Sequence, residues 1–138
     1  MEIKSVVSKL IKKFNTRDPF SIAKQLDIQL LFAELGSYYG CYIYLKRHRC
    51  IIINNQLSPQ LQRLVMAHEL GHAILHKKVN CYFMRNKTLL NTTVFEREAN
   101  TFSAYLLISD DEIEQCNTIG QLSSVAGVPE EIVKLRLK

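Results

Sequence analysis

The chain has 138 residues, a length that fits one domain and can bury a hydrophobic core without disulfides. Hydrophobic residues make up 47% and charged residues 22% of the sequence, as in ordinary globular proteins, and the longest apolar runs are too short for a membrane-spanning helix. The net charge of +5 is spread along the chain, so it permits nucleic-acid binding without arguing for it.

The four cysteines form no C-x-x-C pair. The first 14 residues carry charges throughout and lack the apolar segment of a secretory signal peptide. We therefore expect reduced thiols in a cytoplasmic protein. The cysteines are Cys41, Cys50, Cys81 and Cys116.

Two helices are predicted before the first strand. Apolar residues between Ile3 and Phe14 recur with helical spacing, and lysines occupy the opposite face. Asp18 is a suitable N-cap for a second, shorter helix, which has Pro19 in its first turn and ends at Asp27.

Three strands are predicted next, because three mostly apolar segments are separated by turn residues. A basic cluster at residues 46–49 lies where the last two strands would form a hairpin, and we interpret it as a solvated turn. The helices on either side would cover a small antiparallel or mixed sheet, which makes the expected fold α+β. The predicted strands are residues 28–35, 41–45 and 50–54.

A central helix is predicted over residues 58–76, where a serine–proline pair at the start is followed by helical apolar spacing. It contains the motif His-Glu-x-x-His. His68 and His72 are four residues apart and therefore share a helix face, so both imidazoles can bind one zinc ion while Glu69 holds the attacking water. Two core histidines with backbone partners are the alternative, which the placement of the motif on a helix disfavours.

A catalytic zinc needs a third protein ligand, and the next predicted helix, from Thr93 to about Leu107, offers Glu96 and Glu98. Glu96 is favoured because Asn100 follows it on the same face as a hydrogen-bond partner for the site, and because small residues there would let the two helices approach. Glu96 also fits a capping box with Thr93, so Glu98 stays open as the alternative ligand.

His76 lies one turn beyond His72. Because four residues of helix rise by about 6 Å, these two histidines and His68 cannot all bind one ion. We interpret His76 as a helix C-terminal residue stabilised by the dipole, with polarisation of a substrate carbonyl as the alternative. The metzincin pattern fails, since Leu75 and Lys78 occupy the positions of its glycine and third histidine.

The remaining chain predicts an irregular stretch at residues 77–91 and, after a brief acidic helix capped at Ser109, two short helices within residues 119–138. The helix pair has the spacing of a helix-turn-helix, but a terminal pair that packs on the domain is the favoured interpretation, so direct nucleic-acid binding is not expected. We assign residues 1–138 to one metallopeptidase domain. In the alternative assignment, the helix pair at about 117–138 is a small appendage to that domain.

Two motifs in this order resemble the ImmA/IrrE family of zinc metallopeptidases. The first is HELGHAILH at residues 68–76, and the second is FEREANTF at residues 95–102. Arg17-Asp18-Pro19-Phe20 and the predicted hairpin extend the resemblance to about residues 17–110. Ser103 follows the phenylalanine of the second motif, at the position of the family's usual small residue, and is a mild departure from it.

The resemblance implies a gluzincin-like site in which His68, His72 and Glu96 bind Zn²⁺ and Glu69 is the general base. It also implies an intracellular protease of a prophage or mobile element that cleaves a partner helix-turn-helix repressor, or else a non-proteolytic antirepressor that binds and sequesters the repressor. For the protease, we expect Glu69 to pass a water proton to the leaving amine and an extended substrate to pair with the edge of the sheet. His76, Tyr82 and Tyr105 are candidate oxyanion donors.

Overall fold

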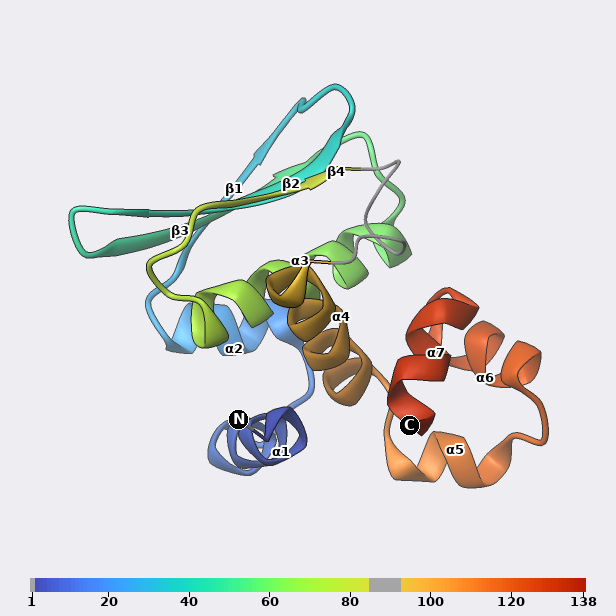
Figure 1. Cartoon of the computed structure of the whole chain (residues 1–138). Coiled ribbons are helices and arrows are strands. Elements are labelled where there is room, and N and C mark those ends of the chain that lie inside the picture. The colour runs from blue at the N-terminus through green and yellow to red at the C-terminus, as the bar shows by residue number, and fades with distance from the viewer. Residues whose placement is uncertain (1, 85–92) are drawn as a thin grey trace.

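A mixed β-sheet carries helices on one face in the computed structural model, which describes residues 2–84 and 93–138 (Figure 1). Helices α2 and α3 lie against the sheet, and α4 follows as the next layer, so the expected α+β fold is confirmed. The elements are α1 (Ile3–Phe14), α2 (Pro19–Gln25), β1 (Gln29–Ala33), β2 (Tyr38–Leu45), β3 (His48–Asn54), α3 (Pro59–Leu75), β4 (Cys81–Met84), α4 (Val94–Leu107), α5 (Asp110–Gln115), α6 (Ile119–Ala126) and α7 (Glu130–Leu137).

The sheet has the strand order β1-β3-β2-β4. Strand β1 runs parallel to β3, whereas β2 is antiparallel to both β3 and β4. The predicted hairpin turns at Lys46 and Arg47, both of which adopt positive φ angles, as the right-handed twist of a tight hairpin favours. Strand β2 begins at Tyr38, earlier than predicted, because Gly40 looks like a strand breaker in the sequence but lies inside the strand.

The fourth strand corrects the prediction of an irregular stretch at residues 77–91. Cys81–Met84 pairs with β2 in the structure, and residues 85–91 of that prediction lie outside the described part of the chain. A four-residue strand is too short to show a period of two, and its pairing depends on partners 39 to 46 residues earlier in the chain. The expected sheet of three strands therefore has a fourth, and β4 forms the edge opposite β1.

Helix α3 is the centre of the fold. The Ser58 hydroxyl accepts a hydrogen bond from the N–H of Leu61, which confirms the predicted N-cap. Residues 64–73 are buried without interruption, because one side of the helix faces the sheet and the other faces α4. A Cβ atom on Gly40 would lie 2.7 Å from Val65 Cγ1, so a glycine is needed where α3 meets β2.

Glycine also brings α3 close to α4. A Cβ atom on Gly71 would lie 3.1 Å from the Phe102 side chain. Ala99 and Ser103 of α4, the small residues that predicted a close approach, are both fully buried. The spacing between the two helices is thus set by small side chains on both.

The C-terminal helices pack on α4. Ile132 and Val133 of α7 are fully buried, and Arg136 Nε donates to the carbonyl of Ile108 at 2.9 Å. Helix α7 begins with the exposed Glu130 and Glu131 and has Lys134 and Arg136 in its last turn, and the expectation against direct DNA reading stays a prediction. The single-domain assignment stays a prediction. None of the helices in the described residues combines the length and apolar character needed to cross a bilayer.

Candidate metal centre

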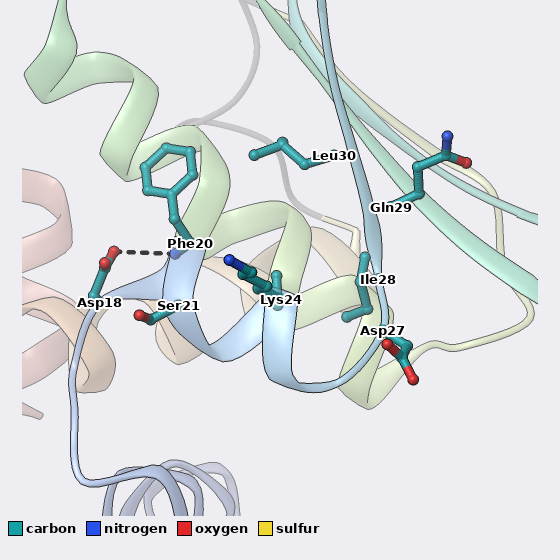
Figure 2. Close-up of a pocket in the computed structure, with 9 residues that line it drawn as sticks. Asp18, Phe20, Ser21, Lys24, Asp27, Ile28, Gln29 and Leu30 are labelled. Atoms are coloured by element: carbon teal, nitrogen blue, oxygen red, sulfur yellow. Dashed lines mark hydrogen bonds between the residues drawn. The ribbon is translucent and has the colours of Figure 1, made fainter.

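A surface pocket of about 570 Å³ lies between α2 and β1, at the edge of the sheet opposite β4 (Figure 2). Its lining combines apolar side chains such as Phe20 and Leu30 with the charged Lys24 and Asp27. The Asp18 carboxylate accepts a hydrogen bond from the N–H of Phe20 and so caps α2. No group of metal-binding side chains was found among these described residues, so the candidate site lies elsewhere, between α3 and α4.

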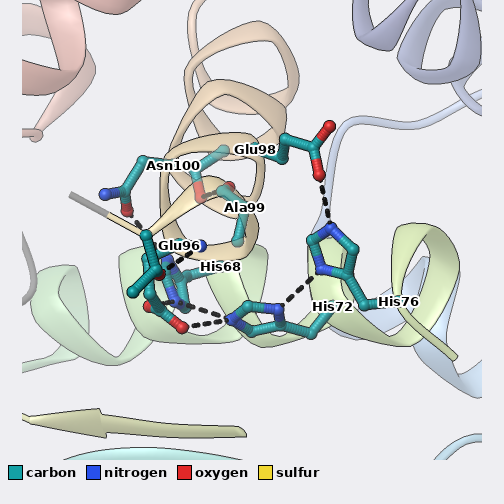
Figure 3. Close-up of polar contacts among 9 residues, drawn as sticks. His68, His72, His76, Glu96, Glu98, Ala99 and Asn100 are labelled. Carbon is teal, nitrogen blue, oxygen red and sulfur yellow. Dashed lines mark hydrogen bonds and ion pairs between the residues drawn. The ribbon is translucent and has the colours of Figure 1, made fainter. Parts of the chain in front are cut away.

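The two histidines of the motif meet on one face of α3 (Figure 3). His68 Nε2 and His72 Nε2 lie 3.2 Å apart, as their spacing of four residues predicts. Both side chains are fully buried, and so is Glu69. The helix thus presents two nitrogen donors at one buried point.

Glu96 of α4 brings a carboxylate to the same point. Its Oε2 lies 3.0 Å from His68 Nε2, and its Oε1 lies 2.9 Å from His72 Nε2. One ligand atom from each of the three residues lies within 4.8 Å of the others, so the group could hold a metal ion. Glu98, the alternative carboxylate, lies instead with Oε1 2.8 Å from His76 Nε2.

Glu96 lies in the first turn of α4, where its backbone N–H is capped and its side chain faces the histidines. The Thr93 hydroxyl accepts a hydrogen bond from the backbone N–H of Glu96 at 3.2 Å, which caps α4. The carboxylate of Glu96 meanwhile contacts the histidines. The predicted capping box would need this carboxylate to accept from the N-cap amide, whereas both of its oxygens contact the histidines in the structure.

The protonation states of Glu96 and His72 suit a cation. Burial tends to raise the pKa of the Glu96 carboxyl, but hydrogen bonds from His68 and His72 outweigh this effect and lower the pKa to about 2. Burial also lowers the pKa of His72, although the hydrogen bond with Glu96 opposes it. An ionised carboxylate and a neutral imidazole both offer a free electron pair to a metal ion.

Glu69 is the unusual member of the site. Neither of its carboxylate oxygens has a hydrogen-bond partner among the residues that the structure describes, although the side chain is fully buried. Burial, and then the nearby charge of Glu96, raises the pKa of Glu69 well above its usual value. A buried carboxyl group without partners destabilises the fold, and a cation with its water is the kind of partner that would satisfy it. The residues present therefore fit a divalent metal ion.

A further set of side chains holds the outer nitrogens of the two histidines (Figure 3). Asn100 Oδ1 lies 2.8 Å from His68 Nδ1, so Asn100 lies at the site as its position on the face of Glu96 predicted. His72 Nδ1 lies 2.9 Å from Nδ1 of His76, the residue that ends α3 as predicted. The pairing of His76 with Glu98 was missed, because it depends on how α4 crosses α3.

Of the two remaining oxyanion candidates, the structure describes the side chain of Tyr105. The Tyr105 ring packs under the guanidinium of Arg136 on α7, 4.8 Å from its centre. The side chain of Tyr82 lies outside the described part of the structure.

Two histidines from one His-Glu-x-x-His helix, a glutamate from α4 and the buried carboxyl of Glu69 beside them form a group that fits the active site of a metallopeptidase. The chain belongs to the Peptidase M78 family, described as the IrrE N-terminal-like domain, whose profile matches residues 23–138. This match confirms the resemblance to the ImmA/IrrE family and the assignment as a metallopeptidase.

Three relatives give the family match its context. "Uncharacterized immunity region protein 2" of Bacillus phage phi105 is 37% identical over 97% of this chain and 88% of its own length. "Metallopeptidase ImmA" of Bacillus subtilis is 29% identical over 82% of this chain and 67% of its own length. "Radiation response metalloprotease IrrE" of Deinococcus deserti is 42% identical over 43% of this chain, but this chain spans only 21% of IrrE.

Proposed function

We propose that this metallopeptidase is a zinc-dependent endopeptidase that cleaves a partner helix-turn-helix repressor in the cytoplasm and so relieves repression of a prophage or mobile element. The observation that carries the proposal is the buried carboxyl of Glu69, which has no hydrogen-bond partner in the described part of the chain, beside a group of two histidines and a glutamate. The name of the phage relative, an immunity region protein, supports a repressor as the substrate.

His68 Nε2, His72 Nε2 and the Glu96 carboxylate are the ligands in this proposal. Two imidazoles and a carboxylate are the donors that zinc takes in catalytic sites, where a fourth position is left for water. When bound, the ion supplies Lewis-acid chemistry, because it lowers the pKa of water and polarises the scissile carbonyl.

Glu69 is the general base. Its raised pKa makes the carboxylate a better proton acceptor than an exposed glutamate, although a cation nearby opposes part of that rise. Glu69 takes a proton from the attacking water and passes it to the leaving amine, so the same oxygen atoms serve both halves of the reaction. A buried position keeps bulk water from competing for that proton.

Strand β4 supports the binding of an extended substrate. It is an edge strand in the described sheet and pairs with β2 on its other side. A substrate segment that adds to this edge would be held by main-chain hydrogen bonds, and helix α3 packs against the same strand. The carboxyl and the two histidines of α3 would then lie beside the bound segment.

The test is co-expression with a candidate helix-turn-helix repressor encoded beside this gene, followed by intact-mass measurement of the repressor. We expect one specific cut with the wild-type chain and an intact repressor with Glu69→Gln. Glu114→Gln, a change at an exposed glutamate of α5, is the matched control and should cut like the wild type. An intact repressor that co-purifies with both the wild type and Glu69→Gln would overturn proteolysis in favour of the antirepressor.

A further inference from the structure

A line of contacts leads from the metal centre to the middle of α4 (Figure 3). His72 Nδ1 lies 2.9 Å from His76 Nδ1, and His76 Nε2 lies 2.8 Å from Glu98 Oε1. His76 is 6% exposed, and the Phe95 ring lies 4.5 Å from its ring. The imidazole of His76 is thus held on three sides, by a histidine, a carboxylate and an aromatic ring.

The direction of these hydrogen bonds is fixed once His72 Nε2 is a metal ligand. His72 Nε2 lies 2.9 Å from Glu96 Oε1 and belongs to the proposed ligand group, so Nε2 would offer its electron pair to a bound metal ion. The proton of neutral His72 is then on Nδ1 and is donated to His76 Nδ1. His76 must accept at Nδ1, which leaves its own proton on Nε2, where it is donated to Glu98. Each N–H of the line has one acceptor in this arrangement.

Asn100 is the corresponding hydrogen-bond acceptor for the outer nitrogen of His68. Its amide oxygen lies 2.8 Å from His68 Nδ1 and can accept the Nδ1 proton of that ring. Three polar side chains of helix α4 therefore contact the histidines: Glu96 between the inner nitrogens, Asn100 behind His68, and Glu98 behind His76.

The alternative is that His76 only ends the helix. The cap, however, is made by its backbone, since the N–H of His76 donates to the carbonyl of His72 at 2.8 Å. The side chain is not needed for that bond. Its buried position between His72 and Glu98 calls for a separate reason.

We propose that His76 and Glu98 are positioning residues, which fix the ring orientation and the Nδ1–H tautomer of His72 and thereby strengthen metal binding. This inference rests on the metal centre of the proposed function. Partners of this kind typically account for about 10–100-fold in metal affinity.

The test measures the zinc affinity of the full chain by competition with a chromophoric chelator, together with the thermal unfolding of each metal-free form. His76→Phe keeps a flat ring but has no acceptor, and we expect zinc affinity to fall by about 10–100-fold. His76→Asn places an amide oxygen where Nδ1 of histidine was, and we expect it to recover most of the loss. Glu98→Gln keeps an acceptor without the charge, and we expect a smaller loss, nearer 10-fold.

Two substitutions far from the histidine contacts serve as controls for zinc affinity. His48→Phe, at an exposed histidine of β3, and Glu114→Gln should bind zinc like the wild type. Zinc affinity of His76→Phe within about two-fold of the wild type would overturn the inference, as would equal losses in His76→Phe and His76→Asn. A wild-type chain that binds no zinc would overturn the proposed metal centre as well, which separates the two failures.

Discussion

Helix α4 packs near charged side chains in two regions, and the two regions differ in whether those charges have hydrogen-bond partners. At the C-terminal end of α4, Arg136 donates to the carbonyl of Ile108 and to Asp110, and Arg17 donates to two backbone carbonyls of the last turn. Toward α3, Glu69 is fully buried and has no partner among the described residues. Partnered charges hold helices together, whereas an unpartnered one weakens the fold and is retained for chemistry.

The largest effect is expected from a substitution of Glu69, the buried carboxyl without a partner among the described residues. Glu69→Gln should lower the rate of peptide cleavage by about 10²–10⁴-fold, because an amide cannot take up the proton of water. Bound metal should stay, since Glu69 is not among the three proposed ligands. The metal-free variant should unfold at a higher temperature than the wild type, because a neutral amide is easier to bury than a carboxylate.

Cleavage by intact mass, metal content by elemental analysis and thermal unfolding check these three statements separately. Glu114→Gln, on the surface of α5, should change none of them. Cleavage at the wild-type rate, with matched metal content, would contradict the role as base. A metal-free Glu69→Gln that unfolds at a lower temperature would contradict the claim that this carboxyl weakens the fold.

The two glutamates of α4, Glu96 and Glu98, are expected to differ in how strongly they affect zinc binding. Glu96→Gln should weaken zinc binding by more than about 100-fold, because it removes a ligand, while Glu98→Gln should cause the smaller loss of an outer partner. Chelator competition measures both. If Glu98→Gln loses zinc and Glu96→Gln keeps it, the wrong carboxylate has been assigned.

The helices around the site could be predicted from the sequence because their signals are local. A serine followed by a proline starts α3, Asp18 caps α2, and histidines four residues apart can only share a helix face. The order of strands and helices then placed the motif on a central helix. Glu96 was favoured for its small neighbours, and these do line the contact between α3 and α4.

The missed features depend on tertiary placement. Strand β4 is four residues long and exists through its pairing with β2, so no local period indicates it. The partner of His76 is decided by where α4 crosses α3, because two glutamates two residues apart point to different places. Sequence spacing fixes which side chains share a helix face, but not which side chain of a neighbouring helix they meet.

The partnered side of α4 offers the third prediction. Arg136→Met should lower the free energy of unfolding by about 1–3 kcal/mol, because the carbonyl of Ile108 loses its donor and the side chain is mostly buried. Zinc affinity should not change. Urea unfolding and chelator competition measure the two quantities, with the exposed Lys134→Met on the same helix as control. A loss of zinc binding in Arg136→Met would mean that the two sides of α4 are coupled.

The smallest effect is expected at Asp110, the exposed partner of Arg136. The hydrogen bond and charge of Arg136 lower the pKa of Asp110 below its ordinary value of 3.8. A lowered pKa in the folded state means that the unfolded chain binds more protons, so the contribution of Asp110 is complete above pH 3.8 and is lost as the pH falls through the folded value.

Asp110→Asn should therefore unfold at a slightly lower temperature than the wild type at neutral pH, and the gap should close in acid and shrink in high salt. Thermal unfolding across the acid range, at low and high ionic strength, measures the gap. Asp111→Asn removes a neighbouring charge from the same first turn of α5 and controls for the helix dipole, which both variants weaken. Equal curves for the two variants would mean that the dipole, and not the contact with Arg136, accounts for the stabilisation by Asp110.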